Sequence, residues 1–230
     1  MSSTAVKPDL RIDWATHAAA KYACENWHYS RSMPVGKTVK VGAWEKSKYI
    51  GCVIFAYGAN NNIGKPYGLQ QEMCCELVRV ALNKHETPVS RIVSFALKWL
   101  KKTNPGIKMV VSYADTQQGH HGGIYQAGNW IFVGTSKGAT QYVLDGRVVH
   151  SMQIQTFIRA GKLKSRAGLQ KVMAGDKHKY LMPLDEEMRA RILPLAKPYP
   201  KRAKDQAASN PDALGGETPT RTLHNYGDAA

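Results

Sequence analysis

The chain has 230 residues, 43% of them hydrophobic, and 32 Lys and Arg against 17 Asp and Glu give it a formal charge of +15. These values fit one globular domain with a substantial core. They exclude a membrane-spanning helix, because no apolar run approaches the roughly 20 residues that such a helix needs. The N-terminus has no basic segment followed by an apolar one, so we expect no signal peptide and a cytoplasmic protein.

The positive charge is concentrated toward the C-terminus. Residues 146–204 carry 14 Lys and Arg against 4 Asp and Glu. A single lysine usually belongs to a solvated surface, but a whole segment with this bias favours contact with the phosphates of a nucleic acid. The cysteines give no comparable signal: the adjacent pair Cys74–Cys75 lacks the C-x-x-C spacing of zinc ligands, and buried free thiols are the better interpretation.

The first half of the chain predicts a helix followed by a strand-rich region. Residues 1–10 look like a loose N-terminal extension, and Asp13 can cap the helix that is expected to follow it. Residues 27–31 are either a helix end whose Trp27 fills the core or a substrate-contacting loop. The expected elements are a helix over 14–26, strands over 39–44, 48–57 and 73–82, and a helix from Pro88 to about Lys102 that Thr87 can cap.

The strand over 73–82 contains two charges in an otherwise apolar run, Glu76 and Arg79. A charge inside a buried strand costs several kcal/mol unless it is paired or belongs to a site. Each residue therefore either finds its own structural partner or lies in a functional cleft.

The stretch from Met109 to Gly134 is the centre of the predicted fold. An apolar strand ends in Ser112, Tyr113 and Asp115, a turn rich in Gly and His follows, and a short helix carries Tyr125. Polar residues at the mouth of a buried strand, followed by a glycine turn, are typical of binding sites in α/β-type folds.

The second half predicts a hairpin and short helices in the basic segment. Asp145-Gly146 between alternating runs indicates a tight hairpin turn. The expected elements are strands over 141–144, 147–150 and 178–184, helices over 152–160, 165–173 and 185–195, and a disordered tail over 201–230.

Several motifs together resemble known families. Tyr125–Gly134 is similar to the closing motif of the GNAT acyltransferase superfamily, with Asn129 and Trp130 in place of its Gly and Phe. More specifically, the chain resembles the Mom DNA-modification family of bacteriophage Mu and its relatives over about residues 20–150. The stretches that carry this resemblance are Asn26–Arg31, Cys75–Val80, Ser112–Asp115 and His120–Tyr125.

The resemblance implies a fold and an activity. The fold class is α+β (mixed α/β): a GNAT-like, mostly antiparallel, splayed central sheet flanked by helices. The expected domains are a catalytic domain over 1–150, a basic helical extension over 151–200 packed on it, and the tail over 201–230. The implied activity is attachment of a carbamoylmethyl (acetamido) group to the N6 atom of adenine in phage DNA, which protects that DNA from host restriction enzymes.

The resemblance also suggests site residues. Tyr125 matches the general-acid tyrosine of the superfamily, and Asp115 lies where the central strands should splay apart and could orient the exocyclic amine or accept its proton. His28, Ser112 and Arg79 complete the expected catalytic set. The pyrophosphate of an acetyl-CoA-like donor would fall on the turn containing His85, Thr87, Val89, Ser90 and Arg91, although the glycine-rich signature of that turn is missing here. The donor itself stays open.

Double-stranded DNA is the expected partner, with its target adenine flipped out of the helix. Aromatic side chains such as Tyr29 could stack on the base, and cations and amides could hold the backbone. The residues expected to contact DNA are Tyr29, Arg31, Asn61, Lys65, Tyr67, Arg159, Lys164 and Arg166. The oligomeric state stays open, with a dimer as one option.

A metal site is a further hypothesis. His28, Asp115 and His120 would form a two-histidine, one-carboxylate set suited to non-haem iron. Residues of these types in loops are also often simply polar surface.

Two other functions stay open at this point. One is an acetyl-CoA-dependent N-acetyltransferase that acts on a small amine or a protein. The other is a non-catalytic DNA-binding protein, which fits the charge but gives no purpose to the polar residues in and beside the buried strands.

Overall fold

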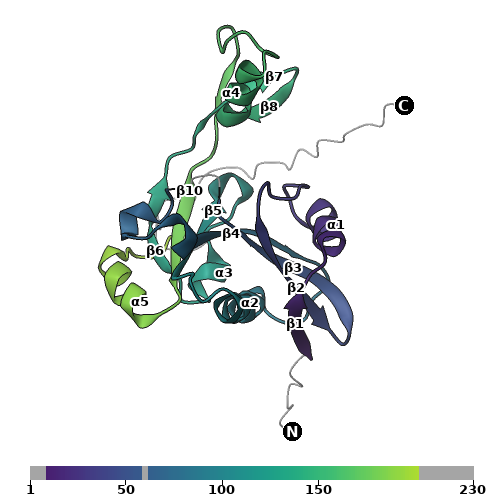
Figure 1. Ribbon diagram of the computed structural model, residues 1–230, viewed down its shortest axis with the longest axis vertical. Helices are drawn as coiled ribbons and strands as arrows, with labels where there is room; N and C mark the ends of the chain where they lie inside the picture. The colour runs from purple at the N-terminus through teal and green to yellow at the C-terminus, as the bar shows by residue number, and fades with distance from the viewer. Residues whose placement is uncertain (1–8, 59–61, 202–230) are drawn as a thin grey trace, which may run out of the picture. The chain divides into compact units, whose positions relative to one another are not determined.

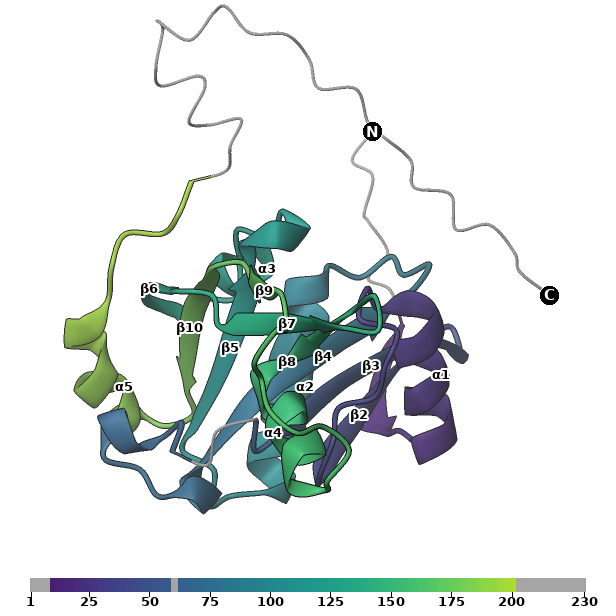
Figure 2. The same cartoon turned by 90° about the horizontal axis from the view of Figure 1, so that it is seen from above.

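The computed structural model describes residues 9–58 and 62–201. Its main sheet has seven strands in the order β1-β2-β3-β4-β5-β10-β6 (Figures 1 and 2). All neighbouring strands are antiparallel except β4 and β5, which are parallel. The prediction of a mixed α+β fold with a mostly antiparallel sheet is thereby confirmed. The strands are β1 Leu10–Trp14, β2 Thr38–Glu45, β3 Lys48–Ala56, β4 Cys74–Leu82, β5 Met109–Asp115, β6 Ile131–Ser136 and β10 Lys177–Pro183.

Helices pack on both faces of this sheet. Alternate residues of β3 face opposite ways: Val53 and Phe55 join the core under α2, whereas Cys52 and Ile54 join the core under α1. The third core cluster lies between the sheet and α5, and it includes Leu181 of β10. The helices are α1 His17–Trp27, α2 Val89–Thr103, α3 Gly123–Gln126, α4 Ser151–Arg159 and α5 Glu186–Ile192.

Two helix starts differ from the prediction. Asp13 lies in β1 and does not cap α1; the side chain of Thr16 accepts the capping hydrogen bond from the N–H of Ala19 at 3.1 Å. At α2 the capping position is held by Pro88, which has no side-chain acceptor, so Thr87 does not cap that helix. Both Asp13 and Thr87 lie within a few residues of the helix start, which is why the local sequence pattern predicted that they cap the helices.

The parallel pair β4–β5 is short, and the two strands then diverge. Only Cys74–Glu76 pairs with Met109–Val111. Beyond that point β4 stays with β3, where a bulge follows Leu77, and β5 stays with β10. The sheet is therefore splayed at Ser112, where β5 no longer pairs with β4, as the resemblance implied.

A separate three-stranded sheet interrupts the chain between β6 and β10. Its order is β8-β7-β9, and α4 belongs to the same insertion. We call residues 137–176 the arm; Figure 1 shows it attached by one segment leaving β6 and another entering β10. The predicted hairpin is confirmed, with β7 Thr140–Leu144 and β8 Arg147–His150.

The predicted helix over 165–173 is wrong. The chain turns there, with a left-handed glycine at Gly168 (φ +80°) and a hydrogen bond from the N–H of Ala167 to Ser165 Oγ, before entering the short strand β9 Lys171–Met173. Sheet pairing with β7 outweighs the local helix propensity of this segment.

The segment after residue 150 does more than pack against the domain. Its strand β10 lies between β5 and β6 and completes the main sheet, where Tyr180 and Leu181 are fully buried. The expected tail over 201–230 lies outside the described residues apart from Lys201. Among the described residues, no helix is long and apolar enough to cross a membrane.

Candidate active site at the splayed strands

The splay is bridged by a buried hydroxyl pair. Ser112 Oγ lies 3.0 Å from the carbonyl oxygen of Leu77 on β4 and 2.8 Å from the hydroxyl of Tyr125. A carbonyl oxygen can only accept, so the single hydroxyl proton of Ser112 goes to Leu77 and Tyr125 donates to Ser112. The expected catalytic residues Ser112 and Tyr125 are thus brought together, and they satisfy a carbonyl that the diverging strands would otherwise leave unpaired.

Tyr125 is held in an aromatic cluster. Its ring centroid lies 5.1 Å from that of Trp130 and 5.0 Å from that of Tyr180. Gly122, which precedes α3 at φ +88°, approaches the Tyr180 ring so closely that no side chain would fit there. Burial raises the pKa of Tyr125 to about 12, so the phenol keeps its proton at neutral pH.

His28 enters the site from the end of α1. The N–H of Ser30 donates to His28 Nδ1 at 3.1 Å, which means that Nδ1 is unprotonated and the neutral ring carries its proton on Nε2. Burial, with the nearby Arg79 and His120, lowers the pKa of His28 to about 4. At neutral pH this side chain is therefore a hydrogen-bond donor through Nε2 and not a base.

Arg79 positions the His28 loop. Its Nε donates to the carbonyl oxygen of Ser32 at 3.2 Å, and Nη1 donates to the carbonyl oxygen of Val78 at 2.7 Å. The charge found in the sequence of β4 thus ties the loop after α1 to that strand. The guanidinium has several donors in a fixed geometry, and Arg79 uses two of them to bind backbone carbonyl oxygens.

Tyr29 connects the two sides of the splay. It is 53% exposed, and its ring centroid lies 4.3 Å from His28 and 5.6 Å from His120. Desolvation and the nearby Asp115 carboxylate raise the pKa of Tyr29, and Tyr29 in turn acts electrostatically on Tyr125. Strand alternation points Ser112 and Asp115 to opposite faces of β5. Tyr29 interacts electrostatically with Asp115 and with Tyr125, the hydrogen-bond partner of Ser112.

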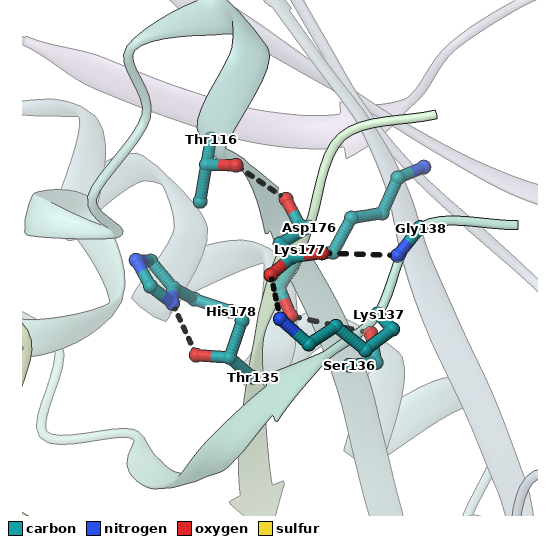
Figure 3. A network of polar contacts seen from close by, with 8 residues as sticks. All are labelled: Thr116, Thr135, Ser136, Lys137, Gly138, Asp176, Lys177 and His178. Carbon is teal, nitrogen blue, oxygen red and sulfur yellow. Dashed lines mark hydrogen bonds and ion pairs between the residues drawn. The ribbon is translucent and has the colours of Figure 1, made fainter. Parts of the chain in front are cut away.

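Asp115 ends β5 at the base of the arm. Its carboxylate accepts from the N–H of Gln117 at 3.0 Å and lies 4.0 Å from Lys177 Nζ. Thr116, the next residue, donates its hydroxyl to the carbonyl oxygen of Asp176 at 2.7 Å (Figure 3). The N–H of Thr116 donates to the same oxygen at 3.1 Å. The candidate catalytic carboxylate and the arm therefore share one network.

Glu76 is a further charged residue at the same place. It lies at the last paired position of β4 before the splay. Burial raises the pKa of Glu76, opposed by the charges of Lys177 and Arg79. The sequence marked Glu76 as unusual in a buried strand, but only the register of β4, β5 and β10 brings it near Lys177.

The turn before α2 differs from the expected donor-binding turn. The carboxylate of Glu45, which is 6% exposed, accepts from the N–H of Glu86 at 2.8 Å and from the N–H of Thr87 at 2.7 Å. Burial alone would raise the pKa of Glu45, but hydrogen bonds from Glu86 and Thr87, together with the charge of nearby His85, outweigh it, and the pKa lies below its ordinary value. An internal carboxylate thus occupies donors that a pyrophosphate would need.

The other residues expected to bind the donor do not restore that site. His85 Nδ1 lies 2.8 Å from the carbonyl oxygen of Thr87, and Thr87 is buried. The guanidinium of Arg91 lies over the ring of Phe95. With Pro88 contributing no N–H and Glu86 adding an exposed carboxylate, the turn does not fit a pyrophosphate. The expectation of an acetyl-CoA-like donor at this turn is therefore not supported by the geometry.

A groove of about 280 Å³ runs along α2. Of the residues expected to hold the donor, Ser90 lines it, together with Lys98 and Lys101 of the same helix and Trp130 at the start of β6. None of Ser112, Asp115 and Tyr125 lines this groove. It is consequently separate from the cluster at the splay.

The hypothetical metal set is not assembled. Within residues 9–58 and 62–201, no group of three His, Cys, Asp or Glu side chains could hold a metal ion. His28 presents a protonated Nε2, and the Asp115 carboxylate caps the turn at Gln117. His28, Asp115 and His120 thus come near one another without forming a coordination sphere.

The residues expected to contact DNA do not all lie on the surface in positions where they could bind DNA. Tyr67 is only 8% exposed and belongs to the core under α5, so it cannot stack on a base. The prediction assumed that a tyrosine in a loop would be exposed, but this one packs against apolar side chains. Arg31 donates to the carbonyl oxygens of Glu25 and Asn26 at the end of α1, a structural role. Asn61 lies outside the described residues. The remaining members, Tyr29, Lys65, Arg159, Lys164 and Arg166, are all exposed.

The family of the chain is shown by its match to a protein-family model. The model of the Mom protein family matches residues 9–201. The chain belongs to the Mom protein family. A relative in this family, the methylcarbamoylase mom of Escherichia phage Mu, is 28% identical over 207 residues, which cover 84% of each chain.

Solved acetyltransferase structures show a more distant likeness. An N-acetyltransferase from Staphylococcus aureus Mu50 is 12% identical, with a TM-score of 0.46 over 76% of this chain and 97% of that one. An IAA acetyltransferase from Bacillus cereus ATCC 14579 is 10% identical, with a TM-score of 0.41 over 76% of this chain and 99% of that one.

Proposed function

We propose that this Mom-family chain is a DNA-modifying transferase that attaches a small amide group to the N6 atom of adenine. The observation that carries the proposal is the cluster at the splay: an acid (Tyr125 with Ser112), a carboxylate (Asp115), a neutral histidine and a half-exposed aromatic ring (Tyr29). Membership in the Mom family supports DNA as the substrate.

In this proposal, Tyr29 stacks on the flipped adenine, whose extrusion costs a few kcal/mol. The N6 lone pair is delocalised into the ring, so N6 needs a group that accepts its proton as it attacks, and Asp115 takes that role. A bond forms between N6 and a carbon of the donor, the bond from that carbon to its leaving group breaks, and Tyr125 protonates the leaving group. His28 Nε2–H donates to the amide oxygen of the transferred group.

Two products of equal mass have to be distinguished. The resemblance implies a carbamoylmethyl group, in which a methylene carbon is bonded to N6. The name of the Mu relative, methylcarbamoylase, denotes a methylcarbamoyl group. On adenine, such a group would be bonded to N6 through its carbonyl carbon. The same residues serve both, because each reaction removes a proton from N6 and protonates a leaving group.

The test is a nucleoside digest of DNA from bacteria that express the protein. We expect a modified deoxyadenosine whose mass matches both isomers. Tandem mass spectrometry against synthetic standards of the two isomers assigns the product, because only the methylcarbamoyl form can lose methyl isocyanate. The Tyr125→Phe variant serves as the control. A folded protein in cells whose DNA contains no modified adenine would overturn the proposal.

The proposed biological role is protection of phage DNA in the host cytoplasm. Modified adenine within a recognition sequence would block a restriction enzyme that reads the N6 amine in the major groove. DNA from expressing cells should therefore resist enzymes with adenine-containing sites and remain sensitive to enzymes whose sites contain only G and C.

The two alternative functions are separated by binding and by mutation. Coenzyme A should not bind by calorimetry, since Glu45 occupies the turn before α2; micromolar binding would favour an N-acetyltransferase. A non-catalytic DNA-binding protein would be favoured if the Asp115→Asn and Tyr125→Phe variants had the same effect as the wild-type chain on the DNA of the cells that express them.

A further inference from the structure

The arm carries a group of exposed cations that the chemistry at the splay does not use. Residues 137–176 contain seven Lys and Arg against two Asp. Of these cations, Lys137 pairs with Asp176 at 3.1 Å. In the part of the chain that the structure describes, no carboxylate forms an ion pair with the other six, all of them exposed: Arg147, Arg159, Lys162, Lys164, Arg166 and Lys171.

The cations of the arm belong to a folded unit. Arg166 Nη2 donates to Gln155 Oε1 of α4 at 2.8 Å, and its guanidinium lies 5.9 Å from the centre of the Tyr142 ring on β7. Ile154 of α4 is fully buried. The segment between α4 and β9, which contains Lys162 and Lys164, is therefore held at both ends.

The base of the arm is bonded directly to the loop that carries Asp115. In the sheet register, Lys177 is opposite both Asp115 and Ser136, so both connections of the arm leave the sheet beside that carboxylate. Asp176 accepts from Lys137 Nζ and from the N–H of Gly138, both at 3.1 Å, and its carbonyl oxygen accepts from Thr116 (Figure 3). The two connections are thus joined to each other and to the site.

We propose that the arm is a phosphate clamp, which grips the DNA backbone beside the target adenine and is held in register with Asp115 by the Asp176–Thr116 network. This inference rests on the proposed function, because it names how the same site holds its substrate. Unpaired, exposed cations on a folded unit are suited to contacts with phosphates, which position DNA without reading its sequence.

The test compares two double variants by fluorescence anisotropy on a duplex. The arm variant is Lys162→Gln with Lys164→Gln. The matched control removes two exposed lysines elsewhere, Lys48→Gln with Lys102→Gln. We expect the arm variant to bind the duplex about 10-fold more weakly near physiological salt, and the slope of log Kd against log salt to fall by about 1 for each lysine. The control should bind as the wild-type chain does.

The outcomes separate this inference from the proposed function. If the arm variant binds with unchanged affinity and salt slope while adenine is still modified in cells, the clamp is wrong and the proposed function stands. If the wild-type chain neither binds duplex DNA nor modifies adenine, both fail. The clamp would also be wrong if the arm variant lost affinity mainly for a duplex RNA of the same sequence and not for the DNA duplex. Circular dichroism must show that each variant is folded.

Discussion

At the scale of single residues, the site is defined by which atom carries each proton. Ser112 must donate to Leu77, so Tyr125 donates to Ser112, and the N–H of Ser30 leaves His28 with its proton on Nε2. These assignments follow from the donors and acceptors alone. They leave Tyr125 with its own proton and make His28 a neutral donor through Nε2, which fits the roles that the proposed function gives to these two residues.

Tyr125→Phe should lower the rate of adenine modification by about 10²–10⁴-fold, because it removes the acid. The affinity for duplex DNA should not change, since the ring remains in place against Trp130 and Tyr180. The measurement is modified deoxyadenosine per enzyme over time, together with anisotropy. A variant with full activity would assign the acid to another residue.

His28 should make stability depend on pH. Its pKa is about 4 in the folded chain against an ordinary 6.5, so the unfolded chain binds more protons between these values. Folding stability therefore falls as the pH drops from 6.5 to 4, by up to roughly 3 kcal/mol.

The matched variant is His28→Asn, whose amide oxygen can still accept from the N–H of Ser30 but does not titrate. Urea unfolding of both proteins at pH 7, 5 and 4 should show a shallower decline for the variant. Identical declines would mean that His28 is not buried as a neutral ring.

At the scale of elements, turns and strand ends hold the site together. The β4–β5 splay opens a gap, Arg79 ties the loop after α1 to β4, and Thr116 ties the loop after β5 to the arm. The turn before α2 is closed by Glu45, which arrives from the end of β2. Each of these contacts joins elements that are distant in sequence.

Thr116→Val should lower the modification rate severalfold and leave the affinity for DNA unchanged. The valine removes the 2.7 Å hydroxyl bond to Asp176, worth about 1 kcal/mol, and loosens the loop that carries Asp115. Thr116→Ser keeps the hydroxyl and should restore the rate. A loss of rate in Thr116→Ser with an unchanged rate in Thr116→Val would instead show that the methyl group, and not the hydroxyl, is what matters.

Glu45→Gln should destabilise the fold by about 1–3 kcal/mol at pH 7, because a neutral amide replaces the carboxylate that accepts two N–H groups. The pKa of Glu45 lies below its ordinary 4.5 in the folded chain, so its contribution is present above pH 4.5 and is lost as the pH falls below that value. The difference between wild type and variant in urea unfolding should shrink at low pH. A constant difference would argue against the ionised carboxylate as its cause.

At the scale of the whole molecule, the segment after residue 150 is part of the main sheet. Strand β10 separates β5 from β6, and its Tyr180 packs on Tyr125. The expected boundary at residue 150 therefore does not mark the end of the main sheet.

A chain that ends at residue 150 should not fold into a stable domain. It would expose the edges of β5 and β6 and leave the core around Trp130 open. The check is thermal unfolding by circular dichroism, compared with a chain that ends at residue 201. A cooperative transition in the shorter chain would contradict the importance of β10.

The sequence by itself determined most elements and most of the site's residue types. Apolar runs bounded by glycine, asparagine and proline predicted β2 to β5, and polar residues at the mouth of β5 pointed to Ser112, Asp115 and Tyr125. These signals are local, since they depend on periodicity and on residues close together in the chain. The same reasoning placed a helix over 165–173, where strand pairing prevailed.

Only the tertiary structure decided what those residues contact. Glu45 in the turn before α2, β10 between β5 and β6, and Asp176 on Thr116 each join segments that are 40 or more residues apart. Hydrogen-bond partners and strand order of this kind depend on the whole packed chain, and no local pattern encodes them. For that reason the residue types at the splay could be predicted from the sequence, whereas the closed turn before α2 and the attachment of the arm could not.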